Sequence, residues 1–341
     1  MLKRLSALVI GGVLLAGPVF AQETTIKFTL GWKTQGSDAA FFYAKDKGFF
    51  KEEGLNVIID QGEGSGATVT RIMSGAWDAG FGDVNAIIQN ASTRPDESPV
   101  MVYMLWNQPP FAIVAKKSSG INSIKDFEGR TLGGAQGTPT TRLLPVFIKK
   151  NGLASDKIKV SNMAPNLQEP MLIKGDIDAA LVFNITSYFN LVLNRQEPDK
   201  DFNWFQFGNF GLDLYSNGVI VSKKLIASNP KAVAGLVRAI NKAVIAIGKD
   251  QNAGMASVAA FDNMVDVPVE KRRLNYSFDK LIVSPEMKDI GVGDIKDDRM
   301  TRAIAMVVEG YDLKRVPEAK EVFSREFLPP RKDRELVYVA N

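Results

Sequence analysis

Two series of short β-runs, separated by helical patterns, constrain the fold of this chain more than any other feature. The first series starts at Thr25 and includes "TIKFTLGW", "DAAFFYAKDKG" and "LNVIID". The second starts after Gly120 and includes "RTLGGA", "PTTRLLPVFIKKNG" and "IDAALVF". Parallel strands need crossover connections of this length, so each series predicts a mostly parallel sheet covered by helices. The chain is therefore predicted to be an α/β protein with two lobes of one architecture.

Two similar stretches flank the second series. "FAIVAKKSSGI" at 111–121 precedes it and "NGVIVSKKLIA" at 217–227 follows it, and each is a short β-run that ends in two lysines. We expect these stretches to pair as the two strands on which the chain crosses between lobes. Two such connections form a hinge that can absorb a closing rotation.

The expected boundaries follow from these crossings. Lobe one is predicted to comprise 22–112 and 219–341, and lobe two 113–218. After the return, the pattern is helical: Asn229 is a predicted cap, Pro230 opens a long helix, and the remaining helices are expected to pack on lobe one.

The first 21 residues have the pattern of a secretory signal. Lys3 and Arg4 form a basic start, an apolar run follows from Leu5 to Ala16, and the small residues before Ala21 are typical of a cleavage site. No later stretch has about 18 apolar residues. We therefore expect cleavage near Ala21 and a mature protein in the periplasm of a Gram-negative cell.

Composition excludes several classes of function. The chain has no histidine and no cysteine, which excludes histidine- or cysteine-based nucleophile systems and ordinary zinc sites. Without Lys3 and Arg4, the 42 Lys and Arg residues become 40 against 38 Asp and Glu, a balance that argues against a nucleic-acid partner. No cofactor is expected, and the chain is predicted not to be an enzyme.

Ligands of open parallel sheets bind beyond the carboxyl ends of the strands, where helices present their amino ends. The segments expected there are the Trp32 loop, the "GEGSGAT" and "AQGTPTT" turns, and the strand ends near Asp83 and Phe183. Each turn can equally be a helix cap that binds nothing, and Trp32 can simply cover the end of a sheet. The candidate ligand-binding residues are Trp32, Gln35, Asp38, Glu63, Ser65, Gly66, Ala67, Asp83, Asn85, Gln136, Thr138, Thr140, Phe183, Asn184, Asp213 and Tyr215.

The chemistry of this set favours a flat ligand. Trp32, Phe183 and Tyr215 supply aromatic walls, and the carboxylates supply hydrogen-bond acceptors. An anion would instead need a lysine or arginine, and only Lys33 and Arg142 are near. The prediction is a heteroaromatic nutrient, pyrimidine-like or flavin-like, with an aliphatic sulfonate, taurine or nitrate as the alternative.

Three motifs, "AFFYAKDKGFFKEEGLNV", "IMSGAWDAGFGD" and "GDIDAALVFN", occur in an order and spacing that resemble the solute-binding proteins of ABC importers. The resemblance is to the group for nitrate, sulfonate, taurine and the thiamine pyrimidine precursor. It implies a type II periplasmic-binding-protein fold, a cleft that closes on a small solute, and an ABC permease in the inner membrane as partner. The chain is expected to be a monomer.

One branch of this family is enzymatic. The resemblance implies that its fungal pyrimidine-precursor synthase consumes its own histidine and uses a cysteine-rich iron motif. This chain has neither residue type, so a synthase is the disfavoured alternative.

Overall fold

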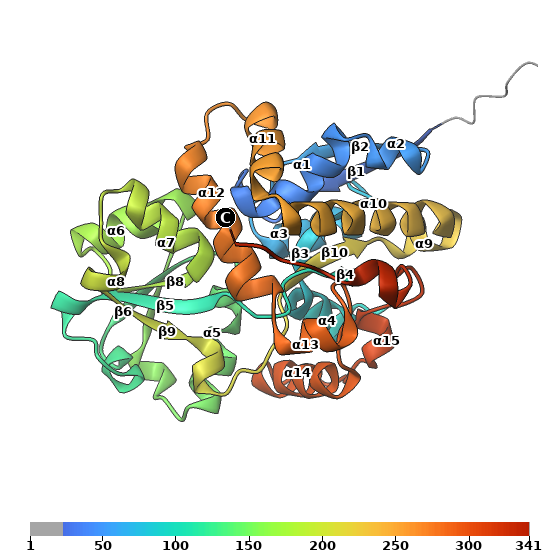
Figure 1. Cartoon of the computed structure of the whole chain (residues 1–341). Helices are drawn as coiled ribbons and strands as arrows, with labels where there is room; N and C mark the ends of the chain where they lie inside the picture. The colour runs from blue at the N-terminus through green and yellow to red at the C-terminus, as the bar shows by residue number, and fades with distance from the viewer. Residues whose placement is uncertain (1–22, 341) are drawn as a thin grey trace, which may run out of the picture.

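The structure, a computed structural model, describes residues 23–340, so the expected signal segment 1–21 and its cleavage site lie outside the described residues. Two five-stranded sheets form the centres of two lobes (Figure 1). Among residues 23–340, no helix combines the length and apolar character needed to cross a membrane.

The sheet of lobe one has the strand order β2-β1-β3-β10-β4. β1, β2 and β3 are parallel, and β10 runs antiparallel between β3 and β4. The edge strand β2 alternates buried and exposed residues, whereas every residue of the interior strand β3 is buried. The strands are β1 (Thr24–Thr29), β2 (Leu55–Asp60), β3 (Ala79–Asp83), β4 (Val100–Met104) and β10 (Asn217–Val221).

The sheet of lobe two repeats this plan with the order β7-β6-β8-β5-β9. β6 pairs in parallel with β7 and β8, and β5 runs antiparallel between β8 and β9. The strands are β5 (Phe111–Lys116), β6 (Thr131–Ala135), β7 (Lys159–Met163), β8 (Ala179–Phe183) and β9 (Phe202–Gln206).

Helices connect the strands of both lobes and begin at recognisable caps. Gly48, at φ 74°, separates the first two helices, and the side chain of Asp83 caps α4 by accepting the Asn85 N–H. The helices of lobe one are η1 (Gly36–Asp38), α1 (Ala39–Asp46), α2 (Phe49–Glu52), α3 (Ser65–Met73) and α4 (Val84–Thr93). Lobe two contains α5 (Pro139–Lys150), α6 (Gln168–Lys174), α7 (Asn184–Leu193), α8 (Pro198–Asp201) and the short 3-10 segments η2 (Lys117–Ser119), η3 (Ile124–Phe127), η4 (Ser155–Lys157), η5 (Pro165–Leu167) and η6 (Phe207–Phe210).

The rest of the chain forms the predicted helical C-terminal extension. Asn229 caps α10 and Pro230 opens it, and α10 and α11 pack on α1 of lobe one. Two helices also reach lobe two, because α12 contacts α7 and α14 contacts α5. The elements are α9 (Lys223–Ser228), α10 (Pro230–Lys249), α11 (Gln251–Phe261), α12 (Val267–Ser277), η7 (Phe278–Ile282), α13 (Pro285–Ile290), α14 (Asp297–Gly310), α15 (Ala319–Val322) and η8 (Arg331–Arg334).

The two stretches expected to cross between the lobes are not paired as predicted. Stretches 111–121 and 217–227 do not pair with each other, because β5 belongs to the sheet of lobe two and β10 to that of lobe one. The contact between the crossing segments involves residues before the first stretch: the N–H groups of Leu105 and Trp106 donate to the carbonyl of Asn217, the first residue of the second stretch, at 3.2 and 2.8 Å. The β-run of each stretch pairs with strands of its own sheet.

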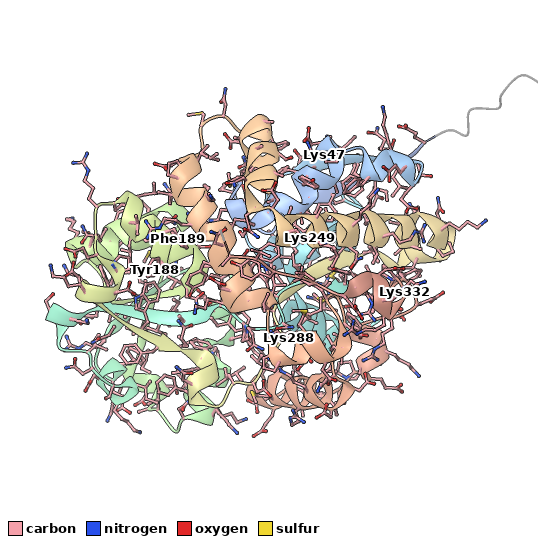
Figure 2. The ribbon with its side chains drawn as sticks, viewed as in Figure 1. Lys47, Tyr188, Phe189, Lys249, Lys288 and Lys332 are labelled. Atoms are coloured by element: carbon pink, nitrogen blue, oxygen red, sulfur yellow. The ribbon has the colours of Figure 1, made fainter. Side chains whose placement is uncertain are left out.

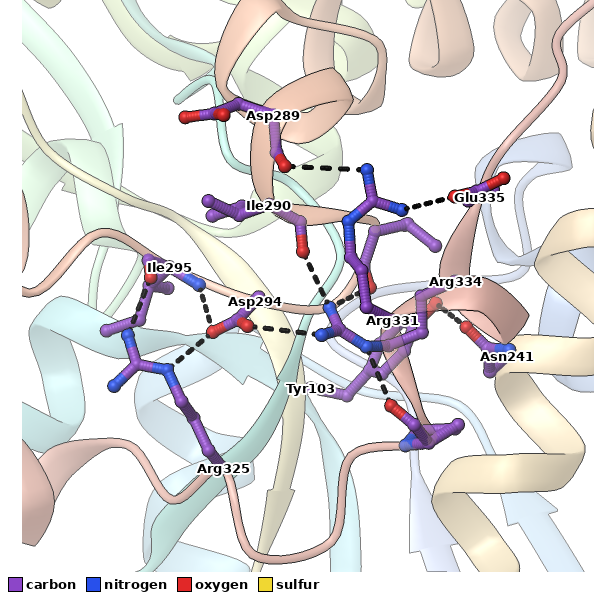
Figure 3. Close-up of polar contacts among 12 residues, drawn as sticks. Tyr103, Asn241, Asp289, Ile290, Asp294, Ile295, Arg325, Arg331, Arg334 and Glu335 are labelled. Atoms are coloured by element: carbon purple, nitrogen blue, oxygen red, sulfur yellow. Dashed lines mark hydrogen bonds and ion pairs between the residues drawn. The ribbon is translucent and has the colours of Figure 1, made fainter.

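A polar network fastens the C-terminal tail (Figure 3). The buried Arg334 donates to the carbonyls of Ile290, Val292 and Pro329 and pairs with Asp294 at 3.3 Å. Arg325 pairs with the same Asp294 at 2.7 Å. The tail is thereby held beside β4, where Met104 bridges Gly293.

Candidate functional site

A cavity of about 640 Å³, including its open mouth, lies between the two lobes. Lobe one contributes the loop from Gly31 to Asp38, the turn at Gly64 and Ser65, and the crossing residues Trp106 and Asn217. Lobe two contributes the amino ends of α5 and α7 and the start of α6. The cavity therefore lies at the carboxyl ends of strands from both sheets, as expected for open parallel sheets.

Four aromatic side chains line this cavity: Trp32, Phe81, Trp106 and Phe183. Trp106 makes edge contacts with Phe81 at 5.1 Å and with Phe183 at 6.2 Å between ring centroids. The indole N–H of Trp106 is buried and has no hydrogen-bond partner. The walls thus offer flat apolar surfaces and an unused donor group beside them.

Two buried carboxyl groups face the cavity from opposite lobes. Asp38 of lobe one caps its own turn by accepting the Gln35 N–H at 3.0 Å, and burial raises its pKa to about 8, an effect that Glu270 increases and Arg273 opposes. Glu169 of lobe two accepts the hydroxyl of Ser187, and burial raises its pKa as well. No lysine or arginine among residues 23–340 lines this cavity.

The lobes touch directly at the cavity. The hydroxyl of Thr186 in lobe two lies 3.3 Å from Oε1 of Gln35 in lobe one. At the amino end of α3, a Cβ built on Gly66 would lie 2.6 Å from the carbonyl oxygen of Gly137, so glycine is needed for this close approach. Both contacts place the lobes near each other around the cavity.

A second, smaller cavity of about 200 Å³ lies beside the first. It is lined by Asp83, Asn85 and Gln89 of lobe one and by Arg142 of lobe two, which donates to Gln89. Burial raises the pKa of Asp83 to about 7, although hydrogen bonds from Asn85 and Ser216 lower it. Its carboxyl group is thus fully engaged in capping α4 and binding its neighbours.

The structure brings together nine of the sixteen candidate residues at these two cavities. They come from the Trp32 loop, the two turns and the strand ends. Trp32, Gln35, Asp38, Ser65, Thr138 and Phe183 line the main cavity, and Gly66, Asp83 and Asn85 line the smaller one.

Tyr215 and Asp213 lie elsewhere than expected. Tyr215 is fully buried, with its hydroxyl donating to Glu286 and its ring 4.1 Å from the Arg299 guanidinium. Asp213 pairs with Arg299 at 2.8 Å. Helices α13 and α14 cover this segment, so both side chains serve the packing of the C-terminal extension.

Five other candidates also fall outside the lining of both cavities. Glu63 is largely exposed and pairs with Arg71 at 3.6 Å, and Gln136 is exposed. Thr140 donates to the Val182 carbonyl, and the Asn184 amide donates to Gln206 at 2.9 Å. Ala67, half-buried on α3, completes the group.

Several residues of the main cavity were not among the candidates. Gln168, Glu169 and Asn190 come from α6 and α7, and Trp106 and Asn217 come from the crossing segments. The one signal in the sequence was the Gln-Glu pair at the start of the "LQEPMLIKG" helix, where an amino end meets the cleft. Among residues 23–340, no group of acidic side chains could hold a metal ion.

The fold and the interlobe cavity define the class of protein: a two-lobed periplasmic-binding-protein fold. Solved structures with this fold include the alkanesulfonate-binding protein SsuA from Xanthomonas axonopodis pv. citri, bound to MOPS, with TM-score 0.69, 14% identity and coverage of 89% of this chain and 99% of that one. SsuA from Escherichia coli gives TM-score 0.68 at 12% identity, over 90% and 94% of the two chains. At these identities the likeness establishes the fold alone.

The chain belongs to the family described as NMT1/THI5 like, which it matches over residues 36–253. A curated relative is the 4-amino-5-hydroxymethyl-2-methylpyrimidine phosphate synthase of Aspergillus parasiticus, 24% identical over 262 residues that cover 74% of this chain and 75% of the relative. The resemblance identified in the sequence is thereby confirmed.

These relatives correct one prediction. The chain was expected not to be an enzyme, but the curated relatives from Aspergillus, Schizosaccharomyces, Legionella and Candida are all named as a synthase. The inference failed because the absence of histidine and cysteine excludes particular mechanisms only. Buried carboxyl groups with raised pKa, such as those of Asp38 and Glu169, are the kind of group that other chemistries use.

Proposed function

We propose that this protein binds a small aminopyrimidine-type heteroaromatic compound between its lobes and serves as the solute-binding component of an ABC importer. The observation that carries the proposal is the pairing of aromatic walls with two buried carboxyl groups in a cavity to which residues 23–340 contribute no lysine or arginine. A flat ring would stack on Trp32, and ring-bound amino groups would donate to Asp38 and Glu169. Ring nitrogens would accept from Asn217 or from the indole of Trp106.

The names of the relatives agree with an aminopyrimidine ring, because they specify a synthase of 4-amino-5-hydroxymethyl-2-methylpyrimidine phosphate. The fold of the SsuA proteins supports the role in transport, with a periplasmic location and a membrane permease as partner. An aliphatic sulfonate is the less favoured ligand, since the described part of the chain places no lysine or arginine in the lining of the main cavity to bind an anionic group.

Titration calorimetry on the mature chain tests this proposal. We expect 4-amino-5-hydroxymethyl-2-methylpyrimidine to bind at micromolar concentration or tighter, and taurine and nitrate not to bind. Ligand released from purified protein by denaturation should absorb as a heteroaromatic compound. Binding of taurine or nitrate without binding of the pyrimidine would overturn the proposal.

The second candidate is the synthase itself, favoured by the names of the curated relatives. Growth of a bacterial strain that cannot make the thiamine pyrimidine separates the two. Rescue without added pyrimidine supports a synthase, whereas rescue that requires a trace of external pyrimidine and the cognate permease supports uptake.

A further inference from the structure

Helix α12 lies between the lobes and contacts both walls of the main cavity. It contacts η1, which contains Asp38, and it contacts α7 of lobe two (Figure 1). Its Tyr276 packs on Tyr188 and Phe189 of α7, at 6.1 and 5.8 Å between ring centroids. Figure 2 labels these two side chains of α7. This helix belongs to the C-terminal extension, so a third segment of the chain joins the two lobes beside the ligand cavity.

At the centre of this contact is a buried ion pair. Arg273 is 1% exposed and binds Glu270 through two parallel bonds, from Nε and Nη2, each 2.9 Å long. Its Nη1 donates to the carbonyls of Ile185 and Thr186 at 3.1 and 3.0 Å, where α7 begins. Nη2 also donates to Oδ1 of Asn190 at 3.3 Å. The guanidinium is therefore bound to lobe two by three acceptors.

The partner carboxylate is bound to lobe one. Oε2 of Glu270 accepts the Gly36 N–H at 2.6 Å, two residues before Asp38. The approach is close, since a Cβ built on Gly36 would lie 2.0 Å from the Glu270 carbonyl oxygen. The ion pair thus connects the turn that holds Asp38 to the helix that presents Thr186 and Asn190 to the cavity.

A buried ion pair contributes little to stability compared with apolar side chains of similar size, because removing two charges from water is costly. This pair instead fixes geometry, because a guanidinium directs its five donors in one plane. Asn190 extends the connection: burial raises the pKa of Glu169, and the side chain of Asn190 is near enough to oppose that rise. Each of the two acidic groups of the cavity is therefore one or two contacts away from Arg273.

We propose that Glu270 and Arg273 are positioning residues that brace lobe two against lobe one and set the distance between the two acidic walls of the ligand cavity. This inference rests on the proposed function in one respect, namely that the cavity binds an aminopyrimidine. The brace itself is a property of the chain with or without ligand. A purely structural ion pair would affect stability but not the interlobe distance.

The absence of cysteine allows a direct measurement. Spin labels on Lys51→Cys and Lys174→Cys, both exposed and one on each lobe, report the interlobe distance by pulsed electron resonance. The test variant is Glu270→Gln/Arg273→Met, which keeps an acceptor for Gly36, removes both charges and deletes the bonds to lobe two. Arg272→Gln is the matched control, because Arg272 is exposed and contacts α7 only over the Phe189 ring, at 5.6 Å, so this variant removes a neighbouring charge and leaves the hydrogen-bonded ion pair intact.

We expect one narrow distance distribution for the wild type and for Arg272→Gln, and a shifted or broadened one for the double variant. The single variant Arg273→Lys, which can still donate to the α7 carbonyls, should give a distribution between those of the wild type and the double variant. In stopped-flow experiments with 4-amino-5-hydroxymethyl-2-methylpyrimidine, the double variant should release the ligand about tenfold faster with little change in association rate.

An unchanged distance distribution in a folded double variant would overturn the brace. So would an equal effect of Arg272→Gln. The distance measurement needs no ligand, so it decides the brace even if the pyrimidine does not bind. Failure of the wild type to bind the pyrimidine counts against the proposed function instead.

Discussion

At the scale of single residues, the cavity depends on acidic groups that folding removes from water. Asp38 is 4% exposed, and its ordinary pKa of 3.8 rises to about 8 because burial disfavours the charged form. The folded protein therefore keeps a proton that the unfolded chain releases from about pH 4 upward. The contribution of this group to stability falls as pH rises from about 4 to about 8.

This loss of stability with rising pH gives a prediction for Asp38→Asn. Asparagine is neutral at every pH and can still accept the Gln35 N–H, so the stability of the variant relative to the wild type should be clearly higher at pH 8 than at pH 5. Urea unfolding at both pH values measures the difference. Asp126→Asn is the control: backbone hydrogen bonds lower the pKa of Asp126, so its effect should be the same at both. An equal difference from the wild type at both pH values would contradict the argument.

Trp32 tests the stacking surface of the proposed site. Stacking of a base on an aromatic side chain is worth about 1–3 kcal/mol, so Trp32→Ala should weaken binding of 4-amino-5-hydroxymethyl-2-methylpyrimidine roughly ten- to hundredfold in calorimetry. Trp77→Ala is the matched control, since Trp77 lies against Arg71, outside the lining of the cavity. Equal affinities of the two variants would exclude stacking on Trp32.

At the scale of elements, local patterns in the sequence predicted most strands and helices but not all pairing partners. "LNVIID" forms the predicted strand, β2, with alternating buried and exposed residues, and Asn229 and Pro230 open α10 as predicted. Strand β9, "FNWFQ", was not predicted, because apolar and polar residues do not alternate regularly along it. Its structure depends on pairing with β5, which is distant in sequence and therefore not visible in a local pattern.

The contact between η1 and α12 is an element-scale feature that a single methyl group can test. Gly36→Ala should destabilise the protein by about 1–3 kcal/mol, because the added Cβ would overlap the Glu270 carbonyl and force the two elements apart. Gly208→Ala is the control, because a Cβ there meets nothing within 4 Å. Chemical denaturation measures the free energy of unfolding of both variants. Equal unfolding midpoints would show that α12 moves away from η1 at no cost in stability.

The C-terminal tail depends on Arg334 in a similar way. Arg334→Met would leave three carbonyls without their donor and Asp294 with one fewer partner, so we expect a loss of about 3 kcal/mol in the free energy of unfolding. Arg331→Met removes a partly exposed arginine of the same network, which pairs with Glu335 and donates to the carbonyls of Lys288 and Asp289, and should cost less, about 1 kcal/mol. Similar losses for both variants would mean that the buried part of the network in Figure 3, around Arg334, is not a distinct anchor.

At the scale of the whole molecule, the sequence predicted the two-lobed fold but only part of the candidate site. Residues at the strand ends of lobe one, such as Trp32 and Asp38, could be placed because the position of a strand end follows from its own pattern. Glu169 and Asn190 could not, since they reach the cavity only through the way the lobes face each other. Tyr215 was misplaced because α13 and α14 cover it, and that packing is encoded about 70 residues later.

The packing of the C-terminal extension on both lobes should also couple their stabilities. One apolar cluster contains Ile87 of α4, Phe147 of α5 and Ile304 of α14, so it extends from lobe one through the C-terminal extension into lobe two. Since α12 also contacts both lobes, we expect the two lobes to unfold together as one cooperative unit.

Calorimetry should accordingly show one unfolding transition for residues 23–340, and not two. Saturating pyrimidine should shift that single transition upward, by about 2.7 kcal/mol of added stability at a ligand concentration of 100 times Kd. Ile304→Ala removes a buried side chain of α14 and should lower the same transition without splitting it, at a cost of about 2–5 kcal/mol. Two separate transitions, with only one of them sensitive to the pyrimidine, would show that the lobes are independent and that the C-terminal helices do not couple them.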